Sequence, residues 1–257
     1  MDPKNRIIFP LDCSTQEEAE FYVSLLQHHV GMFKVGLELF VSQGPNILRS
    51  ITQESGAKVF LDLKFHDIPE TVRKAQLAAN AYGAEFVTVH CDQGRQLLRS
   101  VVDATLGPEL EAPDLEPRPK TQGSGPRACK VLGVTLLTSL DRKNLDDLGM
   151  DQSLSVEELV LRRARLAKAA GCAGVVCSGR EVQIVKEELG KDFLVVVPGI
   201  RPTWQKVMND DQKRITTPTG AVKAGADYVV VGRPIRLADD PVKAALRVAE
   251  EIAGAAG

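Results

Sequence analysis

Eight short runs of apolar, mostly β-branched residues alternate with helix-like stretches along almost the whole chain. The runs lie at residues 6–12, 32–36, 58–64, 85–90, 130–138, 174–178, 193–198 and 228–232. Strands that alternate with helices predict a parallel sheet, and strands without a polar face are covered on both sides. Eight such units are the number in a closed (β/α)8 barrel of about 250 residues. We therefore predict an α/β protein, a single (β/α)8 TIM barrel with its active site at the C-terminal ends of the strands.

A doubly wound open sheet is the alternative fold for this pattern. That fold usually has a glycine-rich fingerprint after its first strand, and none follows residues 6–12. Residues 107–127 contain five prolines, alternate acids with bases and have no apolar periodicity. We interpret them as a mobile surface insertion within one domain that covers residues 1–257, and not as a linker between two domains.

Helices are expected between the apolar runs, and two of them have clear start signals. Ser14 or Thr15, followed by two glutamates, is typical of a helix N-terminus, and Thr217-Pro218 predicts another. A further helix is expected near residues 44–54.

Charge and cysteine content narrow the class of protein. Lys and Arg number 32 against 34 Asp and Glu, a net charge of -2, so no basic excess points to nucleic acid or to an anionic membrane. No stretch approaches the roughly 18 apolar residues of a membrane span, and residues 1–6 lack the apolar part of a signal peptide. Five cysteines without C-x-x-C spacing and four histidines without a ligand pattern predict no disulfide framework and no zinc site. We expect a cytoplasmic protein.

The densest group of charges lies in the third run and the loop after it. Asp62 and Lys64 are two residues apart on a strand, so both side chains point to the same side, and Asp67 follows in the loop. A structural ion pair is the simpler interpretation of an Asp-x-Lys pattern. However, burying three charges beside an apolar strand costs several kcal/mol per ion unless each is matched, which favours a functional site.

Other strand ends are also polar, and in a barrel all of them meet at one mouth. They add the following side chains: Asp12, Lys34, His90, Thr138, Ser178 and Arg233. Gly232-Arg233 after the last strand suits a phosphate, because in this fold the loops after strands seven and eight usually bind one. The alternative is that Gly232 only allows a tight turn and that Arg233 is solvated. The long polar loop from Arg201 to Thr217 is either a lid or a solvated connection.

The run Asp62-Leu63-Lys64-Phe65-His66-Asp67-Ile68-Pro69-Glu70-Thr71 resembles the signature of the orotidine 5′-phosphate decarboxylase family, which catalyses the last step of UMP synthesis. The similarity extends over nearly the whole chain, through segments that include Phe33-Lys34-Val35-Gly36, Pro198-Gly199-Ile200-Arg201-Pro202, Asp211-Gln212 and Val231-Gly232-Arg233-Pro234. The Pro-rich segment 107–127 is the main departure, since it is longer than expected of the family.

The resemblance implies decarboxylation of orotidine 5′-phosphate to UMP without metal or organic cofactor. It assigns Lys64 as proton donor to C6 of the pyrimidine and places Asp62 beside the substrate carboxylate. The remaining implied roles are ribose binding by Lys34 and Asp12, pyrimidine contacts by Thr138 and Ser139, phosphate binding by Gln212, Arg233 and the Gly232 N–H, and a place near the lid for Arg201. It also implies a homodimer in which Asp67 and Thr71 reach into the partner subunit's site.

Two other functions fit parts of the pattern. A different phosphate-binding barrel, such as a sugar-phosphate decarboxylase that uses Mg²⁺, would depend on metal and lose activity with a chelator. A barrel that only binds nucleotide would keep its ligand affinity without Lys64, and the intact group of charges argues against it.

Overall fold

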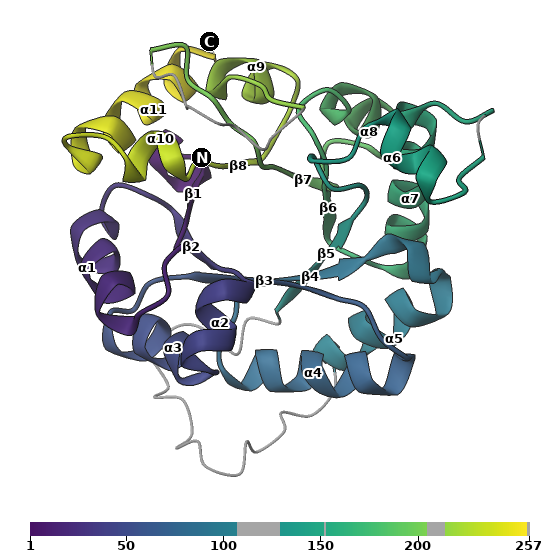
Figure 1. Cartoon of the computed structure of the whole chain (residues 1–257), viewed down its shortest axis with the longest axis horizontal. Helices are drawn as coiled ribbons and strands as arrows, with labels where there is room; N and C mark the ends of the chain where they lie inside the picture. Colours follow the sequence, from purple (N-terminus) through teal and green to yellow (C-terminus); the bar gives the residue numbers. More distant parts are fainter. Residues whose placement is uncertain (107–128, 152, 205–213, 256–257) are drawn as a thin grey trace.

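Eight parallel strands close into a barrel in the order of the chain, which confirms the predicted (β/α)8 fold (Figure 1). The computed structural model describes residues 1–106, 129–151, 153–204 and 214–255. The predicted insertion at 107–127 lies outside these ranges. The strands are β1 (Ile7–Pro10), β2 (Met32–Val35), β3 (Val59–Phe65), β4 (Phe86–His90), β5 (Lys130–Val134), β6 (Gly174–Val176), β7 (Leu194–Val197) and β8 (Tyr228–Val230).

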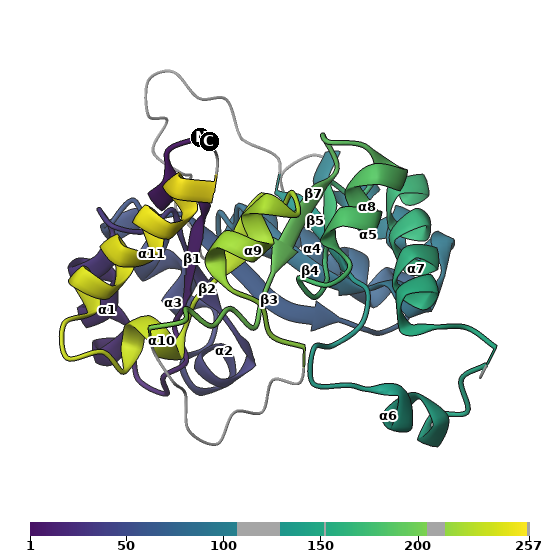
Figure 2. The same ribbon diagram turned by 90° about the horizontal axis from the view of Figure 1, so that it is seen from above.

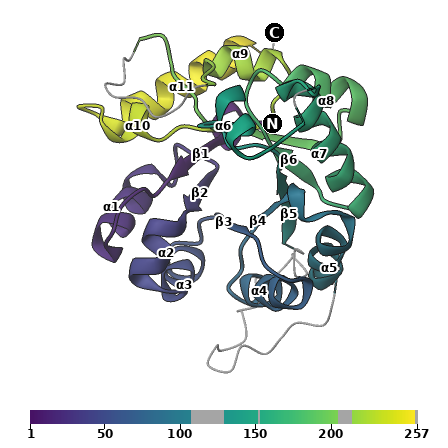
Figure 3. The ribbon, with the colours of Figure 1, turned by 45° about the vertical axis from the view of Figure 1, so that its right-hand side comes forward.

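Helices surround the barrel and cover the outer face of every strand (Figures 1 and 3). They are α1 (Gln16–Leu26), α2 (Leu37–Gln43), α3 (Asn46–Arg49), α4 (Pro69–Ala81), α5 (Arg95–Leu106), α6 (Arg142–Asp147), α7 (Val156–Ala170), α8 (Val182–Leu189), α9 (Pro218–Lys223), α10 (Arg233–Arg236) and α11 (Pro241–Ala255). Three short turns of helix complete the described elements: η1 (Pro3–Arg6), η2 (Ser50–Glu54) and η3 (Cys91–Gln93).

Local sequence explains where several helices begin. Thr15, and not Ser14, caps α1 by accepting a hydrogen bond from the Glu18 N–H, and Thr217 caps α9 in the same way. The helix expected near 44–54 is present as α3 (Asn46–Arg49), which continues directly into η2 (Ser50–Glu54). A separate helix precedes it: α2 ends at Gln43 with Gly44 as its C-cap, whose φ of 69° suits glycine, and Pro45 is the N-cap of α3.

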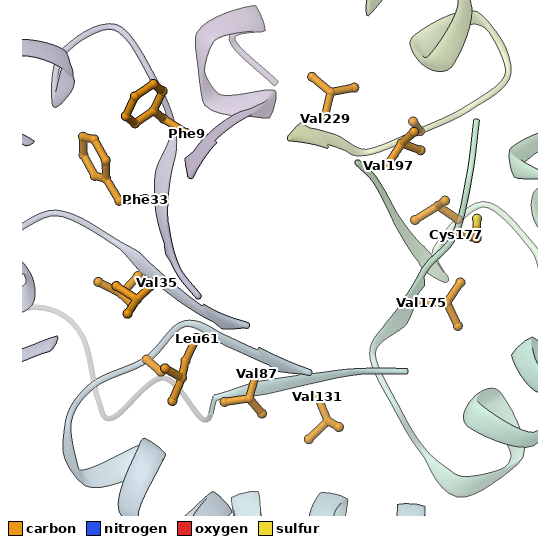
Figure 4. Close-up of a cluster of buried hydrophobic side chains, with 14 of the residues drawn as sticks. Phe9, Phe33, Val35, Leu61, Val87, Val131, Val175, Cys177, Val197 and Val229 are labelled. Atoms are coloured by element: carbon orange, nitrogen blue, oxygen red, sulfur yellow. The ribbon is translucent and has the colours of Figure 1, made fainter. Parts of the chain in front are cut away.

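Two apolar clusters hold the barrel together. The larger one lies between the strands and the helices, and Figure 4 shows its side chains pointing outward from alternate strand positions. The smaller one fills the inside of the barrel with seven buried residues: Ile8, Met32, Phe60, Phe86, Leu132, Val196 and Val230. Inward and outward positions alternate along each strand, so a side chain two residues after a member of the inner cluster also points inward. The inner cluster is therefore the floor for whatever lies at the C-terminal ends of the strands.

The two ends of the barrel differ in what they carry. The N-terminus and the C-terminal helix α11 end at one side of the molecule, and α6 extends from the opposite side (Figure 2). The opposite side is where the strands end, because α2, α6 and α10 lie in the loops that leave β2, β5 and β8. None of the described helices is long and apolar enough to span a membrane.

Candidate active site

One cavity opens at the C-terminal ends of the strands, directly above the inner apolar cluster. Its lining includes Pro10, Lys34, Asp62, Pro198 and Gly232. Each of them stands two residues after a member of the inner cluster, as the alternation along a strand requires. In β2 and β3 the inward side chains thus change from apolar to charged within two residues, from Met32 to Lys34 and from Phe60 to Asp62.

Four charged side chains form a continuous row along this cavity. Lys64 Nζ lies 2.9 Å from Asp62 Oδ2, and Lys34 Nζ lies 3.6 Å from the same oxygen. Lys34 Nζ is also 3.7 Å from Asp12 Oδ1. The side chains of Asp62 and Lys34 are only 12% and 14% exposed, so the surrounding protein screens these interactions less than water would. The predicted pairing of Asp62 with Lys64 is confirmed.

Asp62 is held in its ionised form although it is buried. Burial by itself would raise the pKa of Asp62, but the ammonium groups of Lys34 and Lys64 and hydrogen bonds from Lys64 and Thr88 act more strongly, so the net pKa is lowered. Thr88, in β4, is completely buried and donates its hydroxyl proton to Asp62 Oδ1 at 2.9 Å. Sequence reasoning did not find Thr88, because a threonine among valines is ordinary in a strand.

The backbone at Lys64 departs from regular strand geometry. Its φ is 52°, the one positive value among the described non-glycine residues, and the pairing of β3 with β4 shifts between Leu61 and Phe65. The Lys64 N–H donates to Thr88 Oγ1 at 2.9 Å. A left-handed conformation at a non-glycine residue is costly and is found mostly where function requires a side chain in a defined direction. At Lys64, this conformation occurs together with a side chain whose ammonium points at the carboxylate of Asp62.

Nine residues expected at the site line this one cavity: Asp12, Lys34, Asp62, Lys64, Thr138, Ser139, Arg201, Gly232 and Arg233. Position 232 requires glycine, because a Cβ there would lie only 2.7 Å from Pro10 Cγ. Gln212 lies outside the described residues. These nine residues come from six separate strand ends or loops and converge as a barrel mouth requires. Two other residues expected at the site do not line the cavity.

Those two are Asp67 and Thr71, which are exposed and do not line the cavity of their own chain. Asp67 Oδ1 accepts a hydrogen bond from the Ile68 N–H at 2.6 Å, just before α4 begins. Ile68 between them is 66% exposed. The loop after β3 therefore presents an acid, an apolar side chain and a hydroxyl outward on one short segment.

Two other polar strand ends have roles outside the cavity. His90 is partly buried against His66, with ring centroids 5.2 Å apart, and burial is the main reason that the pKa of His90 is lowered. Ser178 is completely buried, and its hydroxyl donates to the Arg214 carbonyl at 3.4 Å. Neither residue lines the cavity.

The cysteines are all buried and free. Burial raises the pKa of each thiol, to about 11 for Cys13 and about 12 for Cys172, which disfavours the nucleophilic thiolate. Within the described ranges, no group of three His, Cys, Asp or Glu side chains is placed to hold a metal ion.

Comparison with known proteins agrees with this geometry. Residues 5–248 match the family model described as "Orotidine 5'-phosphate decarboxylase / HUMPS family". The chain belongs to this family. It is 44% identical to the orotidine 5′-phosphate decarboxylase of Geobacter sp. (strain M21) over 247 residues, which cover 96% of this chain and 95% of the relative. Its identity to the enzyme of the same name from Desulfosudis oleivorans is also 44%, over 97% of this chain and 94% of the relative.

The fold comparison leads to the same family. The crystal structure of orotidine 5′-phosphate decarboxylase from Lactobacillus acidophilus superimposes with a TM-score of 0.78 at 36% identity, over 96% of this chain and 98% of that one. Membership of the family thus rests on matches to nearly the full length of both chains. The resemblance predicted from the Asp62–Thr71 signature is confirmed at the level of the family.

Proposed function

We propose that the protein decarboxylates orotidine 5′-phosphate to UMP and CO2. The observation that best supports this is the pair of ammonium groups held on one carboxylate at the floor of the cavity, 2.9 and 3.6 Å from Asp62 Oδ2. Further support comes from two relatives that bear the name of this enzyme at 44% identity.

The reaction needs a fixed positive charge where the carboxylate leaves. In this proposal the bond between C6 and the carboxylate breaks, CO2 departs, and the electron pair stays on C6. No π system delocalises that pair, so an ammonium that is already in position must stabilise it. Unit charges 4 Å apart attract by about 4 kcal/mol at an effective dielectric of about 20. Lys64 then transfers a proton from Nζ to C6 and regains one from solvent.

Asp62 has two roles in this scheme. It holds Lys64 and Lys34 in place, and it faces the substrate carboxylate, where the repulsion between like charges is relieved as CO2 leaves. Because Asp62 is held by three partners, Lys34, Lys64 and Thr88, its carboxylate needs little rearrangement during the reaction.

The other cavity residues suit the rest of the nucleotide. Lys34 and Asp12 are the proposed ligands of the ribose hydroxyls, and Thr138 and Ser139 the contacts of the pyrimidine. Arg233 and the Gly232 N–H bind the phosphate, Gln212 adds a further phosphate contact, and Arg201 lies at the edge of the proposed lid. The Gly232 backbone approaches Pro10 closely, which leaves no room for a side chain between the phosphate and β1.

We further propose a homodimer in which Asp67 and Thr71 complete the partner's site. Support comes from the outward position of both side chains, which are exposed and do not line the cavity of their own chain. Two-fold symmetry would make each chain lend its Asp67 to the other. Cytoplasmic location belongs to the same proposal, because the five free thiols suit a reducing compartment.

Loss of the orotidine 5′-phosphate absorbance tests the activity directly. The purified protein should consume the substrate and form UMP at the same rate with and without EDTA. A protein that ignores orotidine 5′-phosphate, but decarboxylates a sugar phosphate until EDTA is added, would instead be the metal-dependent alternative. Binding of UMP without any turnover would indicate a barrel that only binds nucleotide.

Mixed dimers test the shared site. Lys64→Ala and Asp67→Ala homodimers should each be nearly inactive. After the two are unfolded and reassociated together, about half of the dimers should be mixed, and each mixed dimer should have one intact site, so roughly a quarter of all sites should recover. If the mixture stays inactive although mass spectrometry detects mixed dimers, Asp67 serves its own chain.

A further inference from the structure

A buried ion pair lies behind the cavity wall, outside the set of residues that contact the cavity. Arg214 Nη1 donates to Glu181 Oε1 at 2.7 Å, and the two side chains are 6% and 0% exposed. Arg214 precedes α9 in the loop that follows β7, and Glu181 immediately precedes α8. The pair therefore joins the loops that follow two neighbouring strands.

The same guanidinium reaches a third loop, the one that forms part of the cavity wall. Arg214 Nη2 donates to the backbone carbonyls of Leu136 and Leu137, at 3.3 and 3.1 Å. These residues directly precede Thr138 and Ser139, and all four line the cavity. Arginine suits this task because its planar fork fixes several donors in one orientation, which a lysine does not.

Further contacts hold the backbone of Arg214 itself. The Arg214 carbonyl accepts a hydrogen bond from the buried hydroxyl of Ser178 at 3.4 Å. Two residues later, the Thr216 carbonyl accepts from the Arg201 N–H at 2.8 Å, and Arg201 lines the cavity. Arg214 is thus fixed at both its backbone and its side chain between the two walls of the cavity.

Stability alone is a poor explanation for this pair. Taking two charges out of water is costly, and well-packed apolar residues of similar volume are often as stable or more stable. Among the residues that the structure describes, Glu181 Oε2 and Arg214 Nε find no hydrogen-bond partner, although both atoms are buried. Burial also raises the pKa of Glu181 in spite of the nearby guanidinium. An arrangement that is incompletely satisfied fits a role in geometry better than a role in stability.

We infer that Arg214 is a positioning residue, which holds the wall formed by residues 136–139 against the base of the loop after β7. Through this wall it orients Thr138 and Ser139 toward the bound pyrimidine. This role rests on the proposed function, in which those two residues contact the pyrimidine ring. Glu181 acts through Arg214 by fixing the direction of the guanidinium.

A double variant separates position from stability. Arg214→Met/Glu181→Met removes both charges, keeps similar volumes and abolishes the bonds to the Leu136 and Leu137 carbonyls. Its Tm should stay close to that of the wild type, because no unpaired charge remains buried. Its kcat/KM for orotidine 5′-phosphate should still fall by about tenfold to a hundredfold, the effect of a misplaced contact. Glu181→Gln is the matched control, since Arg214 keeps an acceptor there and both carbonyl bonds, and it should lose much less.

Hydrogen exchange provides a measurement that does not depend on activity. Amides of residues 135–140 should exchange faster in the double variant, and amides of β4 (Phe86–His90) should not change. Wild-type kcat/KM together with wild-type exchange in residues 135–140 would overturn the inference. If the double variant does not fold, Arg214→Lys takes its place with the same two expectations. A wild type inactive on orotidine 5′-phosphate would refute the proposed function, and the exchange experiment would still decide whether Arg214 holds the wall.

Discussion

The Lys64 N–H donates to the hydroxyl of Thr88, and the same hydroxyl donates to Asp62 Oδ1, both at 2.9 Å. One side chain in β4 therefore holds two residues of the proposed site in β3, Lys64 through its backbone and Asp62 through its carboxylate. Because Lys64 has a φ of 52°, this contact supports a conformation that the chain would not adopt readily on its own. Thr88 is thus a structural support for the proposed proton donor.

Replacing Thr88 by valine should lower kcat with little effect on folding. Valine preserves the shape and the β-branched fit to the strand, but it removes the donor to Asp62 and the acceptor for the Lys64 N–H. We expect kcat to fall by about tenfold to a hundredfold, because small displacements of a reacting group are costly. Thr88→Ser, which keeps the hydroxyl, is the control and should retain most activity. Steady-state kinetics of both variants on orotidine 5′-phosphate would check this. Equal losses of kcat in Thr88→Val and Thr88→Ser would show that the hydroxyl does not position Lys64 and Asp62.

Arg233→Ala should weaken binding of the phosphorylated substrate selectively. A hydrogen bond to a charged group contributes about 1.5 to 3 kcal/mol, so Kd for UMP should rise by about one to two orders of magnitude. Uridine, which lacks the phosphate, should bind the variant and the wild type equally. Calorimetric titration of both ligands measures the difference. An equal loss for UMP and uridine would place the guanidinium away from the phosphate.

Most of the barrel and most of the site could be predicted from the sequence because both depend on local patterns. The runs of β-branched residues marked the strands, and the period of two placed Asp62 and Lys64 on one side. Strand ends were less accurate. The run 130–138 is a strand only as far as Val134, and residues 136 and 137 lie in the cavity wall with their carbonyls bonded to Arg214.

Thr88 and Arg214 could not be found in this way, since their partners are distant in the chain. Thr88 reaches Asp62 through the register between β3 and β4, which includes an irregular step that no hydrophobic pattern encodes. Arg214 and Glu181 meet across two loops whose approach depends on the closed barrel. The helical run expected near 44–54 is present at 46–54, but the separate helix α2 before it, which Gly44 and Pro45 divide from that run, was not predicted.

Stability at low pH should depend on the carboxylate of Asp62. Since its pKa is below the ordinary 3.8 in the folded protein, ionised Asp62 stabilises the fold above the unfolded pKa, and this contribution is lost as the pH falls through the lower folded pKa. The difference in free energy of unfolding between wild type and Asp62→Asn should be constant from pH 7 to about 5 and shrink below about pH 4. Urea titrations at several pH values measure it. A difference that grows on acidification would mean that the folded pKa is raised instead.

The single tryptophan should report on ligand binding. The Trp204 Nε1–H donates to Glu251 Oε1, and the Arg247 guanidinium lies 4.6 Å from the centroid of the Trp204 ring. Both partners belong to α11, so the emission of Trp204 depends on how this residue packs against α11. Arg201, three residues earlier, lines the cavity. We expect saturating UMP to change the emission of the wild type, with a midpoint at higher UMP concentration in Arg233→Ala. If the emission stays unchanged at saturating UMP, ligand binding does not alter the surroundings of Trp204.

Turnover by Lys64→Ala is the most direct test of the proposed chemistry. The ammonium acts mainly on the developing carbanion, so the variant should have no measurable decarboxylation of orotidine 5′-phosphate while its Kd for UMP stays within a few-fold of the wild-type value. Lys74→Ala, which removes an exposed lysine of α4, is the control and should keep full activity. A Lys64→Ala protein that retains more than a tenth of wild-type kcat would contradict the assignment of Lys64 as the proton donor.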